Sequence, residues 1–133
     1  MNYRYFFKIF SIGAIGYSII EILWRGYTHW SMALTGGFCF SALYRFYTKI
    51  SKKTSTLKKC VCGGIIITAT EFVSGIIFNK ILKLNVWDYS KNRLNISGQI
   101  CPLYSLLWCL LSCPIVCLCK ALNKTWIYIW FLI

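Results

Sequence analysis

Acidic side chains are the scarcest feature of this sequence. Its 133 residues include three Asp or Glu against 15 Lys or Arg, which gives a formal net charge of +12. In a soluble protein this excess of bases would suggest a nucleic-acid partner, but the sequence contains no recognition module, and its bases fall mostly between apolar runs. We therefore expect no nucleic acid as a partner, and we expect anionic lipid headgroups beside the basic residues instead.

Motifs that mark well-known catalytic and ATP-binding sites are also missing. The sequence has no Walker A motif, no Gly-x-Ser-x-Gly and no His-Glu-x-x-His, and His29 is its single histidine. Two Cys-x-Cys pairs, at 60–62 and 117–119, could share a soft metal only if both were unwound, because residues two apart on a helix point about 200° apart. We expect no enzymatic activity, no cofactor and no metal site, so any ATP-driven role needs a separate partner.

Apolar residues, by contrast, make up 58% of the chain. This is more apolar surface than a soluble domain of this size can bury, so the bilayer must act as solvent for much of it. We predict an all-α membrane protein with a single integral domain over residues 1–133, four transmembrane helices in two hairpins, and a C-terminal interfacial segment. The predicted spans are residues 5–24, 30–47, 60–82 and 99–119, with a basic inner loop at 48–59, a polar outer loop at 83–98 and an interfacial tail at 120–133.

The distribution of Lys and Arg predicts the orientation, since these residues are enriched on the cytoplasmic side of membrane proteins. One side of the predicted topology carries both chain ends and the basic loop, with Arg4, Lys8, the six bases from Arg45 to Lys59, Lys120 and Lys124. The other side carries Arg25, Lys80, Lys83, Lys91 and Arg93. We therefore expect a multi-pass protein of the cell membrane with cytoplasmic N- and C-termini and an outward-facing polar loop.

The acids are the first candidates for function. Glu71 falls at the middle of the third predicted span, where an isolated charge is costly, so it should face the interior of the bundle. It is either a proton- or cation-linked site or a neutral acid that joins helices by hydrogen bonds. Glu21 and Arg25 lie four residues apart on one helical face with the acid first, which is the favourable order for a salt bridge.

The third acid, Asp88, lies in the polar loop among other hydrogen-bonding residues. Asp88, Tyr89 and Asn95 predict a loop folded back on itself by side-chain bonds to its own backbone. Such a loop is either a lid over a site below it or a structured turn between the third and fourth helices. The candidates for binding or transport are Glu21, Arg25, Glu71, Asp88, Tyr89, Asn95 and Gln99.

Several motifs along the chain carry a family resemblance. They are Gly16-Tyr17-x-x-x-Glu21, Arg25-Gly26-x-x-His29-Trp30, Asn85-Val86-Trp87-Asp88-Tyr89-Ser90 and Leu94-Asn95-x-x-Gly98-Gln99-Ile100-Cys101. With them, and over nearly its whole length, the sequence resembles a family of small membrane proteins from Firmicutes labelled putative ABC-transporter type IV, or putative ABC transporter permease. The resemblance implies a membrane-embedded transport component, with no substrate or catalytic residue to carry over.

These observations favour transport through or beside an acidic outer vestibule formed by Glu21, Arg25, Asp88 and Asn95, with Glu71 deeper. One alternative is a structural or accessory subunit that packs against another membrane complex through small-residue helix faces. In either case the partners would be a second copy of the chain or another membrane subunit. A less favoured alternative is a membrane enzyme acting on lipid headgroups, with Asp88, Glu21 and His29 as acid and base.

Overall fold

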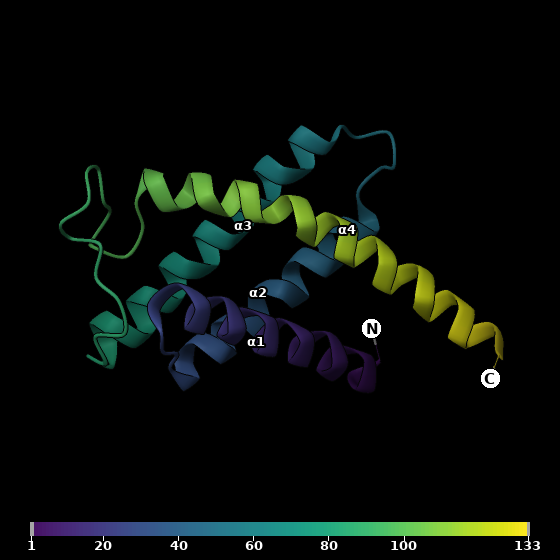
Figure 1. Ribbon diagram of the computed structural model, residues 1–133, viewed down its shortest axis with the longest axis horizontal. Helices are drawn as coiled ribbons and strands as arrows, with labels where there is room; N and C mark the ends of the chain where they lie inside the picture. Colours follow the sequence, from purple (N-terminus) through teal and green to yellow (C-terminus); the bar gives the residue numbers. More distant parts are fainter. Residues whose placement is uncertain (1, 133) are drawn as a thin grey trace.

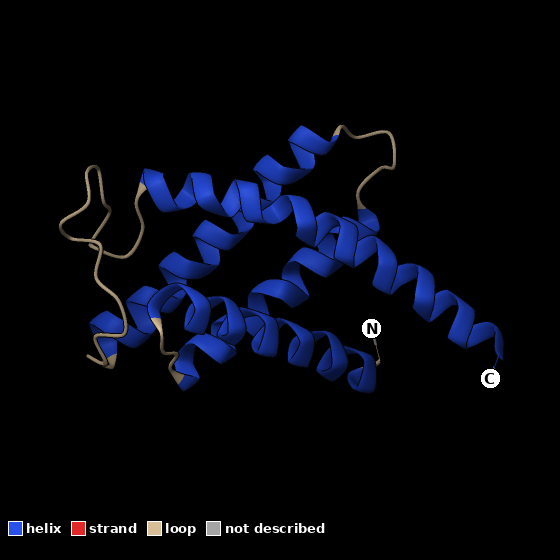
Figure 2. Ribbon diagram, viewed as in Figure 1, coloured by secondary structure: helices blue, strands red, loops and turns tan. Residues whose placement is uncertain are grey.

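The computed structural model describes the backbone of residues 2–132 and the side chains of residues 2–125. Within this part of the chain every regular element is helical, which confirms the predicted all-α class (Figure 2). The elements are α1 (Tyr3–Arg25), α2 (Trp30–Lys49), α3 (Thr56–Gly75), the π-helical segment η1 (Ile76–Ile81) and α4 (Pro102–Leu132). Because η1 follows α3 directly, the two form one continuous helical rod.

The four helices run back and forth between two ends of the molecule (Figure 1). Both chain termini and the α2–α3 connection lie at one end, which we call the terminal end. The short α1–α2 turn and the long α3–α4 connection lie at the opposite end, which we call the loop end. Helices next to each other in sequence pack together, α1 with α2 and α3 with α4, as expected for two hairpins.

Helix α2 is the central element, because it contacts each of the other three helices. More than half of its 20 residues are buried, whereas α1 buries only three of 23. Close approach to α1 depends on glycine: a Cβ on Gly13 would lie 2.4 Å from the Cβ of Phe40, and one on Gly36 would lie 2.4 Å from the Cβ of Tyr17. A larger residue at either position would push the two helices apart.

Three helices are long and apolar enough to cross a membrane, namely Tyr3–Arg25, Thr56–Ile81 and Pro102–Thr125. Helix α2 falls outside this set, so composition supports three of the four predicted spans. Its small and polar residues, among them Ser31, Thr35 and Ser41, are buried against the other helices. A helix covered by its neighbours need not be apolar on every face, which explains its lower hydropathy.

The helix boundaries differ most from the predicted spans in α3 and α4. Helix α3 begins at Thr56, so the end of the predicted basic loop is helical, and Ser55 caps it by accepting a hydrogen bond from the Lys58 amide. Helix α4 begins at Pro102 and runs without interruption to Leu132, so residues 120–132 of the predicted tail continue the helix. The interfacial position of this tail stays a prediction, and the side chains of its aromatic residues lie outside the described part.

Candidate functional site

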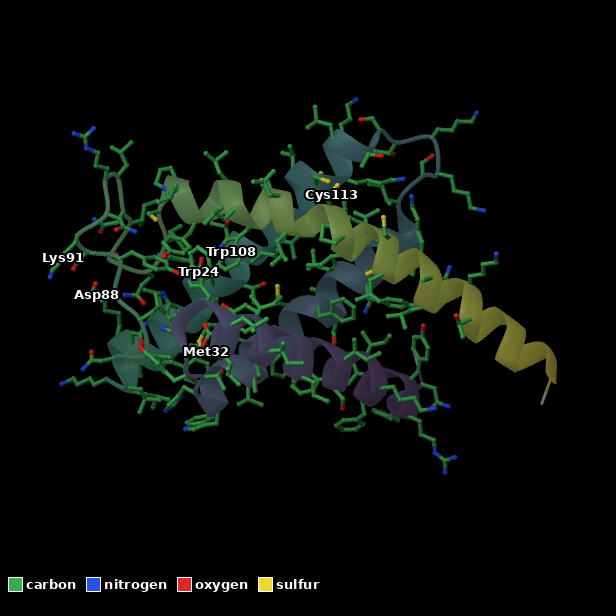
Figure 3. The ribbon with its side chains drawn as sticks, viewed as in Figure 1. Trp24, Met32, Asp88, Lys91, Trp108 and Cys113 are labelled. Atoms are coloured by element: carbon green, nitrogen blue, oxygen red, sulfur yellow. The ribbon has the colours of Figure 1, made fainter. Side chains whose placement is uncertain are left out.

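The connection between η1 and α4, residues 82–101, is longer than the predicted loop at 83–98, and we keep the name polar loop for it. Asp88 accepts hydrogen bonds from the Ser90 amide and hydroxyl at 2.8 and 2.9 Å. These bonds, assisted by Lys80 and Lys91, hold the pKa of the exposed Asp88 carboxyl below its usual value. Figure 3 shows Asp88 and Lys91 at the outer edge of the loop, away from the helices.

Asn95 organises the tip of the polar loop. Its amide nitrogen donates to the carbonyls of Ser90 and Asn92 at 3.1 and 2.8 Å, and its side-chain oxygen accepts from the Gly98 amide at 3.0 Å. Gly98 has φ +67°, and a Cβ there would lie 2.9 Å from a carboxylate oxygen of Asp88. The side chains of Asp88 and Asn95 are therefore engaged in folding the loop itself.

Beneath the loop, Asn79 of η1 forms a buried polar centre that the sequence analysis did not single out. Its side-chain oxygen accepts from the Val86 amide at 2.7 Å, and its nitrogen donates to the Trp87 carbonyl at 3.0 Å and the Gln99 side chain at 2.8 Å. The Trp87 indole donates to the Gln99 carbonyl at 3.0 Å, so Gln99 receives bonds from two sides. The one signal in the sequence was that Asn79 is the single amide in the third apolar run.

Glu71 lies deeper, in the middle of the α3–η1 rod, and is only 5% exposed. Its two carboxylate oxygens each accept one hydrogen bond, from the Tyr89 hydroxyl at 2.9 Å and from the Trp108 indole at 2.8 Å. The Tyr89 ring stacks on Tyr104 of α4, with centroids 4.5 Å apart and planes 10° from parallel. Burial and the nearby Glu71 carboxylate raise the pKa of Tyr89, so its hydroxyl stays a donor.

The predicted pair of Glu21 and Arg25 forms at the loop end of α1, with a nitrogen–oxygen distance of 2.6 Å. Arg25 also donates to the Val86 carbonyl at 3.1 Å and stacks over the Tyr27 ring at 4.9 Å. Among the described side chains, its Nε and the Thr28 hydroxyl are buried without a hydrogen-bond partner. Arg25 therefore ties α1 to the polar loop through Val86, and the partnerless polar atoms could be satisfied by a bound molecule.

The seven predicted site residues thus separate into groups by position. Glu21 with Arg25 and Glu71 with Tyr89 form two bonded pairs, one at the end of α1 and one beneath the polar loop. Asp88 and Asn95 shape the outside of the polar loop, and Gln99 supports it from below. Trp108, which the prediction lacked, completes the Glu71 site from α4. Among the described residues, no three His, Cys, Asp or Glu side chains are grouped so that they could hold a metal.

Residues 5–131 match the model of a family described as putative ABC-transporter type IV. The chain belongs to this family. In this member of the family, the motif residues 85–90 and 94–101 form the polar loop and its contacts with Glu71, Asn79 and Arg25. Neither the comparison with curated proteins nor that with solved structures gave a match.

Proposed function

We propose that this family member is a transport component of the cell membrane in which Glu71 is a proton- or cation-linked site beneath the polar loop. One observation carries the proposal. A carboxylate buried in the middle of an apolar rod receives hydrogen bonds from two different elements, the polar loop through Tyr89 and α4 through Trp108. Ionisable residues at this depth are costly and are commonly placed there for transport or proton transfer.

The arrangement suggests how charge and conformation are linked. Hydrogen bonds to an ionised carboxylate are about twice as strong as those between neutral groups. When Glu71 takes up a proton or binds a cation, its bonds from Tyr89 and Trp108 weaken, and the polar loop loses part of what holds it against α4. The loop then opens more readily, because the open state holds the added proton or cation more tightly than the closed state does.

The proposed outer vestibule includes fewer of the predicted residues than the sequence suggested. Glu21 and Arg25 form its wall, with the partnerless Arg25 Nε and Thr28 hydroxyl as further polar groups. Asp88 and Asn95 maintain the shape of the lid, since their side chains are occupied within the loop. Glu71 is the deeper site.

The proposed topology has α2 crossing the membrane together with the three apolar helices. Both termini and the basic α2–α3 connection lie at the terminal end, and the polar loop lies at the other (Figure 1). Positive residues concentrate at the terminal end, which favours a cytoplasmic position for it. An ATPase or another energy source would then act from a separate subunit.

The accessory-subunit alternative depended on small-residue faces open to a partner. Gly13 and Gly36 are used between α1 and α2, and Gly63 and Gly64 are used between α3 and the side chains of Ser112 and Cys109. These contacts inside the chain account for most of the glycines in the helices, and Gly16 of α1 is the one left open. We therefore favour a transport function over an accessory role. A second copy of the chain or a partner subunit could still assemble with this transport component.

The test is an infrared titration of the protein in lipid nanodiscs. Wild type should show a buried carboxyl band that appears on acidification together with faster amide exchange in the polar loop. Glu71→Gln should lack the band, and Asp88→Asn should retain it. The proposal fails if no buried carboxyl titrates, if loop exchange does not follow the band, or if Glu71→Gln transports an identified solute as wild type does in proteoliposomes.

A further inference from the structure

A cavity of about 340 Å³ opens at the terminal end, where α2, α3 and α4 meet. Its lining includes the ammonium-bearing side chains of Lys52, Lys59 and Lys120 and the polar side chains of Thr48 and Asn123. This volume lies within the range of small-molecule sites. A second cavity of about 370 Å³ shares Thr48 and Asn123 with it and adds Arg45 and Lys49. The two form one basic surface built by all four helices and the α2–α3 connection.

Lys59 is the residue that points to a ligand. It is 5% exposed, although lysines are almost never buried unless they are paired. Its backbone carbonyl accepts a hydrogen bond from the Tyr47 hydroxyl at 2.9 Å, which fixes the first turn of α3 against α2. Among the described residues, no hydrogen bond or ion pair involves its ammonium group, and the side chain lines the cavity.

No acidic side chain of the chain can neutralise Lys59. Glu21 pairs with Arg25 at the loop end, and Asp88 lies in the polar loop. Glu71 is twelve residues further along the same rod, or about 18 Å at the rise of a helix. Lys52, Lys59 and Lys120 line one cavity without an acidic partner, so their like charges repel and a ligand that brings negative charge would stabilise the cavity.

We propose that this cavity binds the phosphate group of an anionic phospholipid, with Lys59 at its centre and Lys52 and Lys120 beside it. The site lies at the end of two apolar helices long enough to span, which is the depth of the lipid headgroups. Three lysines with Thr48 and Asn123 supply both charge and hydrogen-bond donors for phosphate oxygens. The proposal does not depend on the Glu71 site, which lies toward the loop end.

The proposed phospholipid site is more specific than a diffuse attraction between a basic loop and the membrane. Diffuse attraction would treat Lys53 and Lys59 alike, because both lie near the α2–α3 connection. Lys53 is exposed and does not line the cavity, whereas Lys59 is buried in its wall. Lys120 comes from α4, far from the basic loop in sequence, so the site exists only in the folded protein.

The experiment is native mass spectrometry of the protein released from phosphatidylcholine nanodiscs that contain phosphatidylglycerol. Wild type should retain phosphatidylglycerol in preference to phosphatidylcholine. Lys59→Gln should lower its retention at least about tenfold, given the energy of one hydrogen bond between charged groups. Lys53→Gln, which removes the same charge from the neighbouring α2–α3 connection, should retain the lipid as wild type does, and Lys59→Arg should restore retention.

Thermal unfolding of each variant separates loss of the site from loss of the fold. If Lys59→Gln does not fold, Lys120→Gln provides the same test from α4. Equal retention of the two lipids by wild type, or equal losses in Lys53→Gln and Lys59→Gln, would overturn the proposal. Lys59-dependent binding of inorganic phosphate without a preference between the lipids would overturn the assignment to a lipid.

Discussion

The indole of Trp108 donates a hydrogen bond of 2.8 Å to the carboxylate of Glu71, which joins the middle of the α3–η1 rod to α4. The second oxygen of the same carboxylate is bound by Tyr89. The two residues that hold the buried acid are 18 and 37 positions away from it in sequence. Glu71 is therefore the point at which the polar loop, α3 and α4 are held together.

Removal of the indole donor should destabilise the protein while preserving an aromatic ring. We expect Trp108→Phe to lower the free energy of unfolding by about 1.5–3 kcal/mol, the range for hydrogen bonds to charged groups. The measurement is thermal or denaturant unfolding in a mild detergent. Trp24→Phe is the control, since Trp24 is 69% exposed and should change stability little. Equal effects of the two substitutions would show that the bond to Glu71 contributes nothing.

Asn79 should be essential for the position of the polar loop. Asn79→Leu leaves the Val86 amide and the Trp87 carbonyl without their side-chain partner, at about 1–3 kcal/mol for each buried group left unsatisfied. We expect faster proteolysis at Lys91 and Arg93 in the variant. Lys80→Leu, one residue away, should leave the cleavage rate near that of wild type. Equal protease resistance of the polar loop in Asn79→Leu and in wild type would show that Asn79 does not hold the loop in position.

Two glycines on either side of the α1–α2 interface should respond in opposite ways to alanine. A Cβ on Gly36 would lie 2.4 Å from the Cβ of Tyr17, so Gly36→Ala should cost about 1–3 kcal/mol through overpacking. A Cβ on Gly16 would meet no atom within 4 Å, so Gly16→Ala should be neutral or should stabilise by up to about 1 kcal/mol through helix propensity. Unfolding midpoints of the two variants give the comparison, and the same sign for both would show that the helices are not packed this closely.

Acidification should loosen the tip of the polar loop through Asp88. Its pKa is lowered in the folded protein by hydrogen bonds from Ser90. The stabilisation is therefore present above the unfolded pKa of about 3.9 and is lost as the pH falls through the folded value. Amide exchange of residues 88–98, corrected for the intrinsic rate, should rise in that acidic range. Asp88→Asn should show a smaller pH dependence, and an unchanged profile would rule out Asp88 as the group responsible.

Local spacing accounts for the parts of the site that sequence could predict. Glu21 and Arg25 are one helical turn apart, so a helix alone brings them together, and their ion pair is present. Asp88, Ser90 and Asn95 are near enough in sequence to bond within one loop, as predicted. The donors to Glu71 could not be found in this way, because Trp108 approaches only after α3 and α4 have packed.

The sequence by itself determined that the chain is helical, apolar and basic, because these properties follow from periodicity and composition. It also determined that Glu71 would be buried, since this residue falls in the middle of a long apolar run. Only the tertiary structure decided that α2 lies at the centre, that Tyr89 and Trp108 share the Glu71 carboxylate, and that Lys59 is buried far from any acid. These relationships depend on contacts between distant segments, and no local pattern of residues specifies which helix faces will meet.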